Sequence, residues 1–188
     1  MMKKALAGLS ALLFMLLING CNQLTRYTIT EQEVNQALQK RNDYQKDIGL
    51  AGLVNAHIVL NDLTSQIGRE TPGQVMLSGK ARVNISSLFG PQQAEMQLRM
   101  RAQPDFSQQQ GAIYLRDMEI VEVHVTPEKM QPVLQTLTPL LNQSLKGYFN
   151  QKPAYVLSED RSKTEALAKK FAKGLEVKPG QLIIRFTD

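Results

Sequence analysis

The stretch that decides the fold runs from residue 75 to residue 102 and reads VMLSGKARVNISSLFGPQQAEMQLRMRA. Apolar residues or Gly occupy every second position of residues 75–85 and again of residues 94–102, and most positions between them are polar or charged. Side chains alternate between the two faces of a strand, so each run predicts a strand with one apolar face and one solvated face. Phe89-Gly90-Pro91 lies between the runs and is typical of a turn. The stretch therefore predicts an antiparallel hairpin.

Two further strands flank this hairpin. Residues 54–60 alternate in the same way before a turn at residues 69–73, and an apolar-rich run covers residues 112–125. The apolar phase slips twice within this last run, which predicts bulges that bend the strand. Four long one-sided strands cannot bury one another while they stay flat, so we expect a curved antiparallel meander.

Two capping boxes mark the shorter helices. Thr30-Glu31-Gln32-Glu33 predicts an N-terminal helix over about residues 31–46, closed near Gly49. Ser162-Lys163-Thr164-Glu165 predicts a second short helix that ends near residue 174. Pro179-Gly180 then predicts the turn of a terminal hairpin.

The longest apolar stripe belongs to a helix predicted from Thr126-Pro127-Glu128 to residue 149, capped by Thr126 and kinked by Pro139. Its stripe consists of Met130, Val133, Leu134, Leu137, Leu140, Leu141, Leu145 and Phe149. This stripe is too wide for a helix that rests on a flat surface. The expected fold class is therefore α+β: a strongly curved antiparallel β-sheet wrapped around a long kinked apolar helix, with an N-terminal helix and a C-terminal helix plus hairpin.

The N-terminus has the organisation of a bacterial lipoprotein signal. Lys3 and Lys4 precede an uncharged run over residues 5–18, which is too short to span a membrane comfortably. Leu17-Ile18-Asn19-Gly20-Cys21 then resembles a lipobox, and Cys21 is the only cysteine of the chain. The alternative is an ordinary signal peptide followed by a stray cysteine. We favour acylation of Cys21, because the single cysteine falls at the cleavage position.

These features divide the chain into a signal peptide over residues 1–20, a lipidated tether over residues 21–29 and one periplasmic domain over residues 30–188. By resemblance to enterobacterial lipoproteins, Asp after the cysteine would retain the protein in the inner membrane. Asn22 stands there instead. We therefore expect the outer membrane of a Gram-negative bacterium, with the body facing the periplasm.

Several blocks resemble a family of uncharacterised enterobacterial lipoproteins over essentially the whole chain. They are Cys21–Thr25, Tyr27–Glu33, Leu63–Glu70 and the segment from Tyr148 to Leu157. That family is similar to the tubular lipid-binding superfamily, in which a strongly curved sheet wraps a long helix around an apolar groove. The resemblance implies this fold and a lipid ligand. It supplies no catalytic or binding residue to carry over.

The sequence does not indicate catalytic chemistry. The net charge is +5, or +3 once the two lysines of the signal peptide are removed, so nucleic acid is not an expected partner. His57 and His124 lie far apart in sequence and suit partly exposed strand positions better than a metal site. Glu119 and Glu122 are three apart on a strand, hence on opposite faces unless a bulge intervenes. We expect no enzyme activity, no cofactor and no metal.

Four basic residues are expected on the solvated faces of neighbouring strands, namely Lys80, Arg82, Arg99 and Arg101. They suit either anionic lipid headgroups or cross-strand pairs such as Arg82 with Glu95. We favour the pairs, because the net charge is small.

Two functions remain open. The first is binding of a lipid or another hydrophobic ligand in an apolar groove, for which the candidate residues are Met96, Met100, Met118, Val133, Leu137, Leu141 and Leu145. Met76 is also expected to face inward, and methionine adapts to varied apolar partners, although it fills gaps in ordinary cores as well. The second is an envelope scaffold or adaptor with a dry core that acts through protein–protein contacts. The expected partners are the membrane, through the lipid anchor, and either a lipophilic ligand or an envelope protein.

Overall fold

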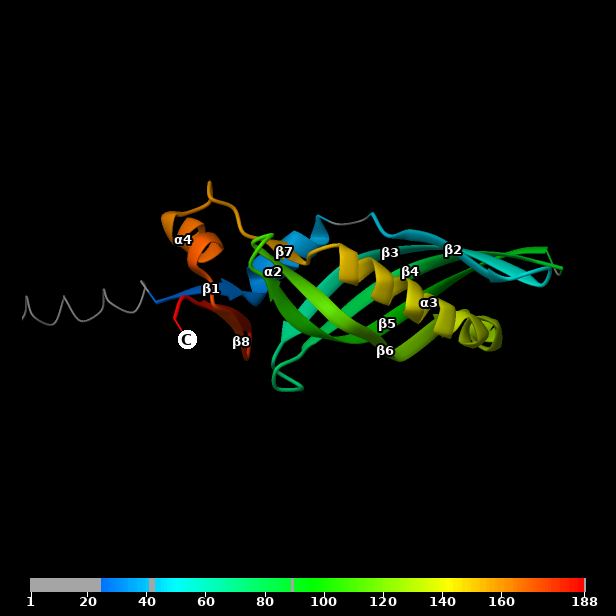
Figure 1. Cartoon of the computed structure of the whole chain (residues 1–188). Helices are drawn as coiled ribbons and strands as arrows, with labels where there is room; N and C mark the ends of the chain where they lie inside the picture. Colours follow the sequence, from blue (N-terminus) through cyan, green and yellow to red (C-terminus); the bar gives the residue numbers. More distant parts are fainter. Residues whose placement is uncertain (1–24, 41–42, 89, 188) are drawn as a thin grey trace, which may run out of the picture.

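The structure is a computed structural model that describes residues 25–40, 43–88 and 90–187, and it contains two antiparallel sheets (Figure 1). A six-stranded sheet has the order β2-β3-β4-β5-β6-β7, and a three-stranded sheet has the order β1-β9-β8. In chain order the elements are β1 (Arg26–Thr30), α2 (Glu31–Gln39), β2 (Gln45–Leu50), β3 (Val54–Ile67), β4 (Val75–Ser87), β5 (Gly90–Ser107), β6 (Ala112–Thr126), η2 (Glu128–Met130), α3 (Gln131–Gln151), β7 (Tyr155–Val156), α4 (Lys163–Phe171), β8 (Gly174–Lys178) and β9 (Gln181–Arg185).

The meander of β3, β4, β5 and β6 is confirmed. Val75 of β4 pairs with Ala102 of β5, and Val83 pairs with Ala94, so apolar residues meet on one face of the sheet. The register shifts twice between β5 and β6 and once between β3 and β4. Bulges bend strands and increase their twist, which accounts for the strong curvature of the sheet (Figure 1).

Helix α3 lies in the hollow of this curved sheet and packs along β6 (Figure 1). Its buried residues are Leu134, Leu137, Leu141, Leu145 and Phe149, which are at most 2% exposed. The helix continues through Pro139 from its first residue to its last. Val133 differs from the prediction, because it is 37% exposed. It precedes the buried Leu134 in the first turn, and neighbouring helical residues point about 100° apart.

The start of α3 also differs from the prediction. Thr126 is the last residue of β6, where it pairs with Glu95, and it does not cap the helix. The short helical turn η2 follows, and α3 begins after it with Pro132 in its first turn. Pairing within the sheet therefore overrides the local capping signal.

The N-terminal helix is shorter than predicted. The capping box between Thr30 and Glu33 is present, but α2 ends at Gln39. Ile48, which the helical pattern included, lies on strand β2 and faces Ala56 of β3. Residues 54–59 of β3 offer backbone partners to β2, and this pairing stabilises an extended conformation that the short helical pattern does not indicate.

The small sheet brings the two ends of the described chain together. Arg26 of β1 pairs with Arg185 of β9, and the β8–β9 hairpin is present as predicted. The tether predicted over residues 21–29 is therefore too long, because residues 26–29 belong to β1. Cys21 and Asn22 lie outside the described residues.

Candidate ligand-binding site between β2 and α3

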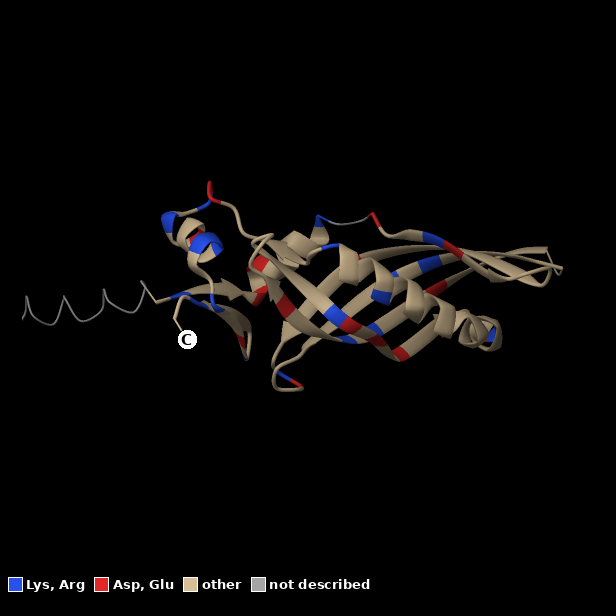
Figure 2. Ribbon diagram, in the orientation of Figure 1, with Lys and Arg blue, Asp and Glu red and all other residues tan. Residues whose placement is uncertain are grey.

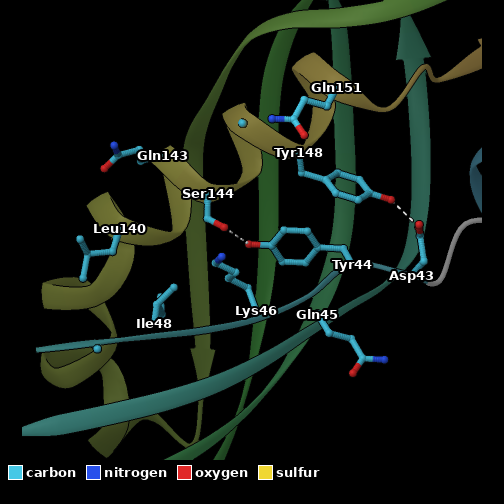
Figure 3. A pocket seen from close by; sticks show the side chains of 12 residues that line it. Asp43, Tyr44, Gln45, Lys46, Ile48, Leu140, Gln143, Ser144, Tyr148 and Gln151 are labelled. Carbon is cyan, nitrogen blue, oxygen red and sulfur yellow. Dashed lines mark hydrogen bonds between the residues drawn. The ribbon is translucent and has the colours of Figure 1, made fainter.

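A pocket of about 590 Å³ lies between the edge strand β2 and helix α3 (Figure 3). Strand β2 is the first strand of the six-stranded sheet, so only one of its edges is paired within that sheet. The pocket is lined by Asp43, Tyr44, Gln45, Lys46, Ile48, Gly49, Leu140, Gln143, Ser144, Gly147, Tyr148 and Gln151. The pocket therefore lies beside the buried stripe of α3, where the helix meets the edge of the sheet.

The helix supplies one wall of the pocket. Leu140, Ser144, Gly147 and Gln151 are spaced three or four residues apart, and Tyr148 lies four residues after Ser144, so they share one face of α3. This face is adjacent to the buried stripe. A Cβ atom added to Gly147 would meet no atom within 4 Å, so the pocket has free space at this point.

The strand and the residues before it supply the other wall. Tyr44 is buried, and its backbone carbonyl accepts a hydrogen bond from the Leu60 backbone N–H at 3.2 Å. Ile48 is also buried, whereas Lys46 is exposed at the rim. The pocket therefore has an apolar and aromatic floor with a polar rim.

Two tyrosines connect the walls (Figure 3). The Tyr44 hydroxyl donates to Ser144 Oγ at 3.0 Å, and the Tyr148 hydroxyl donates to Asp43. The two rings meet edge to face, with centroids 5.2 Å apart and an interplanar angle of 82°. Burial raises the pKa of Tyr44, and the hydrogen bond to Ser144 opposes this only in part. Tyr44 is therefore a neutral phenol that holds the helix to the strand.

The chemistry of the pocket suits binding. Ser144 Oγ accepts a hydrogen bond from the Tyr44 phenol. Within the described ranges, no group of three His, Cys, Asp or Glu residues is arranged to hold a metal ion. Apolar and aromatic surface beside amide, hydroxyl and ammonium groups suits an amphiphilic molecule.

The groove residues predicted from the sequence lie elsewhere. Met96, Met100 and Met118, together with Leu137, Leu141 and Leu145, are at most 1% exposed in the central core. None of them lines the pocket, and neither does the exposed Val133. Met76 is buried at 8% exposure, but it lies opposite Arg101 on the other face of the sheet from Val75 and Leu77.

The sequence prediction does not include these pocket residues, because it places residues 40–46 in a helix and takes the leucine stripe of α3 as the groove wall. A usable signal was nevertheless present in α3. Gly147 interrupts a long helix, where glycine is unfavourable without a packing or functional reason. Tyr148 follows Gly147 directly, and Ser144 lies three residues before it. A mixed polar and aromatic face therefore flanks the leucine stripe.

The solvated face of the sheet carries ion pairs. Arg99 contacts Glu70 at 2.8 Å and Glu122 at 3.0 Å, and Arg101 contacts Glu119 at 2.6 Å. Glu119 and Glu122 thus share one face of the sheet. This differs from simple alternation, because the register shift inserts an extra residue between them. Both glutamates are engaged in ion pairs with arginines.

The remaining residues that the sequence singled out are also paired or exposed. Lys80 lies 3.8 Å from Asp62, and Arg82 stands opposite Glu95 in the register. His57 Nδ1 lies 2.8 Å from Asp47, and His124 Nε2 lies 2.8 Å from Glu122. These residues form a solvated, internally compensated face.

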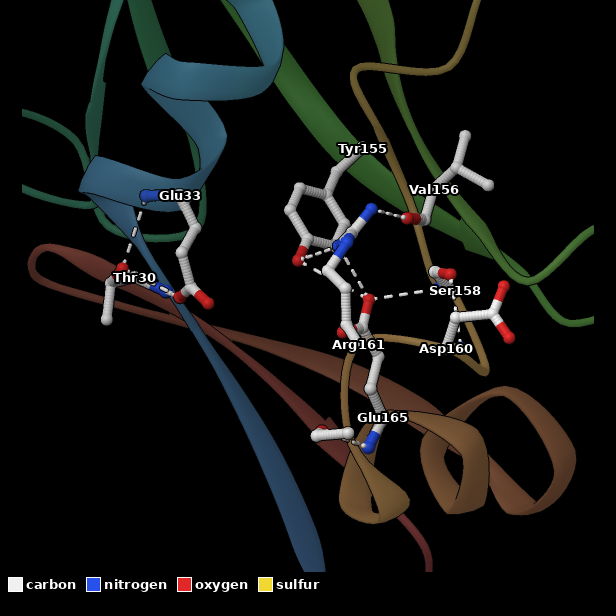
Figure 4. Close-up of polar contacts among 9 residues, drawn as sticks. Thr30, Glu33, Tyr155, Val156, Ser158, Asp160, Arg161 and Glu165 are labelled. Carbon is white, nitrogen blue, oxygen red and sulfur yellow. Dashed lines mark hydrogen bonds and ion pairs between the residues drawn. The ribbon is translucent and has the colours of Figure 1, made fainter.

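A second polar cluster surrounds the buried Glu165 of α4 (Figure 4). Its carboxylate accepts hydrogen bonds from Arg161 Nη1 at 2.7 Å and from the Ser158 backbone N–H at 3.0 Å. Arg161 also donates to the Tyr155 hydroxyl and, at 2.9 Å, to the Val156 carbonyl. Burial and the charge of Glu165 raise the pKa of Tyr155, while Arg161 opposes them. The cluster fastens the segment after β7 to α4.

Fold and pocket define a class of protein in which a curved antiparallel sheet encloses one long helix, with an amphiphilic pocket at the seam. A family described as a protein of unknown function, DUF1439, matches residues 29–181, and the chain belongs to this family. It is 64% identical over 172 residues to the uncharacterized lipoprotein YceB of Salmonella typhimurium. The matched region covers 92% of this chain and 92% of the relative. It is 60% identical over 179 residues to the uncharacterized lipoprotein YceB of Escherichia coli K12, which covers 95% of this chain and 96% of the relative.

These relatives confirm the resemblance to a family of uncharacterised enterobacterial lipoproteins. Both are named as lipoproteins of Gram-negative bacteria, in agreement with the lipobox around Cys21 and with membrane association through a lipid anchor. Among the described helices, none has the length and apolar character needed to cross a membrane.

Proposed function

We propose that this protein is a periplasm-facing lipoprotein of the outer membrane that binds a lipid or another hydrophobic ligand in the pocket between β2 and α3. The lipobox that ends at Cys21 supports the anchor, and Asn22 after it supports the outer membrane. The proposal involves binding without a chemical step.

The observation that carries the proposal is the pocket at the seam between helix and sheet. Its volume of about 590 Å³ lies within the range of about 300–1,000 Å³ that is usual for small-molecule sites. Leu140 and Ile48 provide apolar surface on opposite walls, while Gln143, Gln151 and Lys46 provide polar groups. An acyl chain would lie against the former and a polar head against the latter.

Native mass spectrometry of the mature body, residues 22–188, tests this proposal. A co-purified lipid mass that disappears on denaturation would support it. A variant that fills the pocket gives a sharper test, since Gly147→Leu adds a side chain where the glycine leaves open space. It should lower the uptake of a fluorescent fatty acid or phospholipid at least about tenfold by direct exclusion.

The matched control is Gln135→Leu, which adds the same side chain at an exposed position of α3 outside the pocket. It should leave uptake unchanged. Equal uptake by the wild type and a folded Gly147→Leu variant would exclude the pocket as the binding site.

A second candidate function is an envelope scaffold or adaptor. The observation in its favour is the packed core, since Met96, Met100 and Met118 are at most 1% exposed. A clean apo mass in native mass spectrometry, with no uptake of any lipid probe, would favour this function over ligand binding.

A further inference from the structure

Two hairpin turns at one end of the molecule expose leucine side chains. The exposed fraction is 36% for Leu50 and 63% for Leu53, which belong to the turn between β2 and β3. It is 81% for Leu88, between β4 and β5. Val54 pairs with Ser87, so the two turns lie side by side. We call the surface formed by Leu50, Leu53 and Leu88 the apolar tip.

The apolar tip lies in the largest uncharged region of the sheet. Residues 48–56 and residues 83–94 contain no Asp, Glu, Lys or Arg. Figure 2 shows this end of the sheet without coloured residues, whereas the middle of the sheet carries both signs of charge. Large aliphatic side chains at the outermost point of a hairpin are unfavourable in water. Moving each one from water into an apolar medium raises the partition constant several-fold.

Backbone hydrogen bonds close the turn between β2 and β3. The Leu53 N–H donates to the Leu50 carbonyl at 3.0 Å, and Leu50 pairs with Val54 in the ladder. Gly52 adopts a φ of 76°, which closes this turn. Such a turn enters an apolar medium with few unpaired backbone groups.

The apolar tip is remote from the point where the chain leads to its anchor. Strand β1 and the C-terminus lie at the opposite end of the elongated molecule (Figure 1). Strand β5 has 18 residues and runs from the tip toward that end, which corresponds to about 60 Å along its path. Residues 22–25, between the lipidated cysteine and β1, extend over about 14 Å at most.

We propose that the apolar tip inserts into a lipid bilayer that faces the bilayer holding the N-terminal anchor. A convex tip of three leucines presents too little area for a stable protein interface, which usually buries about 1,200–2,000 Å². The same convex shape suits entry between lipid headgroups. The proposal relies on the proposed anchor for its direction, but it does not rely on the ligand pocket.

The charges behind the tip predict which bilayers it binds. Lys46 is followed by Asp47, and Arg82 stands opposite Glu95, so the two signs balance. Binding should therefore occur on zwitterionic phosphatidylcholine vesicles. It should change less than about twofold between low and physiological salt, in contrast to binding by a basic patch.

Vesicle capture tests the proposal. The mature lipidated protein is reconstituted into phosphatidylcholine donor vesicles, and sucrose-loaded protein-free acceptor vesicles of the same lipid are collected by centrifugation. We expect donor vesicles to sediment with the acceptors. The double variant Leu53→Gln and Leu88→Gln should reduce this capture at least about tenfold, because both apolar insertions are lost.

The matched control is Val121→Gln with Phe171→Gln, which removes two apolar side chains of 45% and 48% exposure away from the tip. It should retain capture. Capture that is equal in the folded tip variant, or present only with anionic acceptors at low salt, would overturn the proposal. Absent capture by the wild type would overturn it together with an unchanged emission spectrum of the labelled variant described next.

A labelled variant separates the tip from the anchor. The chain has one cysteine, at position 21, so Leu88→Cys in a body of residues 22–188 carries a single thiol for an environment-sensitive fluorophore. Phosphatidylcholine vesicles should shift its emission to the blue even without an anchor. An unchanged emission spectrum would overturn insertion of the tip, whereas a shift without donor capture would locate the failure in the proposed anchor.

Discussion

At the scale of single residues, Gly147 has the clearest consequence. Its φ is not in the left-handed region, it lies inside α3, and a Cβ atom at its position would meet nothing within 4 Å. Gly147→Ala should therefore stabilise the protein by about 0.5–1 kcal/mol, because alanine loses less backbone entropy in a helix. Urea denaturation followed by circular dichroism measures this change. A destabilised Gly147→Ala variant would show that the space at Gly147 is occupied.

Glu31 gives a prediction for the pH dependence of stability. Burial raises its pKa, but the hydrogen bond from Arg69, the Ile67 backbone N–H and the charge of Arg69 together lower it below its ordinary value. A carboxylate with a lowered pKa stabilises the fold above its unfolded pKa, and this contribution is lost as the pH falls through the folded pKa.

Glu31→Gln should consequently lower the free energy of unfolding by about 1–2 kcal/mol at neutral pH. The difference from the wild type should shrink on acidification below the ordinary titration range of glutamate. Unfolding curves at several pH values test this, and a difference that stays constant with pH would contradict the charged contact. Glu128→Gln is a suitable control, because this exposed acid also lies in the first turn of a helical element.

At the scale of an element, α3 has two kinds of leucine. Leu141 is 1% exposed in the central core, whereas the neighbouring Leu140 is half-buried and lines the pocket. Leu141→Ala should cost about 2–5 kcal/mol, since it leaves a cavity in packed surroundings. Leu140→Ala should cost about 1 kcal/mol or less, because open space already exists beside it, and it should weaken uptake of a fluorescent lipid. Equal stability losses at the two positions would mean that the pocket wall is as tightly packed as the core.

The elements differ in how well the sequence predicted them. Strands β3 to β6 and the hairpin of β8 and β9 follow from alternation and turn residues, since these signals are local. Strand β2 is not predicted: the expected helix over residues 31–46 overlaps its first two residues, because Ile48 fits helical spacing and the pairing of β2 with β3 is not visible in the local pattern. The shared face of Glu119 and Glu122 depends on a bulge whose position only the register defines.

The candidate site could not be predicted from the sequence, because it depends on contacts between distant segments that local patterns do not show. Its two walls come from segments about 100 residues apart, and the bond from Tyr44 to Ser144 joins them. The methionines and leucines chosen from the sequence are inward-facing, but inward-facing residues of a closed core and of a groove share the same alternation. Only packing distinguishes them, and it assigns the pocket to the neighbouring face of α3.

At the scale of the whole molecule, the proposed lipid anchor at Cys21 gives a direct prediction. Cys21→Ala should abolish labelling by radioactive palmitate and release the protein from membranes, because several acyl chains account for the membrane affinity. Metabolic labelling and fractionation measure both effects. Membrane association of an unlabelled Cys21→Ala variant would contradict the lipoprotein assignment.

Sorting between the two membranes gives a separate prediction. Asn22→Asp should shift the protein toward the inner membrane on a sucrose gradient, while Asn22→Gln should leave it in the outer-membrane fraction. The expected difference arises from one carboxylate at the residue that follows the lipidated cysteine. An unchanged distribution of Asn22→Asp would show that another signal determines the destination.

The pairing of β1 with β9 has a mechanical consequence. The five pairs from Arg26 with Arg185 to Thr30 with Gln181 connect the segment next to the anchor with the last strand of the chain. A pull on the proposed lipid anchor would act along β1, so these pairs would resist in parallel, as in shear, and would not open one at a time. Glu31 follows β1 directly and contacts Arg69 and the backbone of Ile67. Tension from the membrane would thus pass through the small sheet into the long strands, and the body would move as a unit with its anchor.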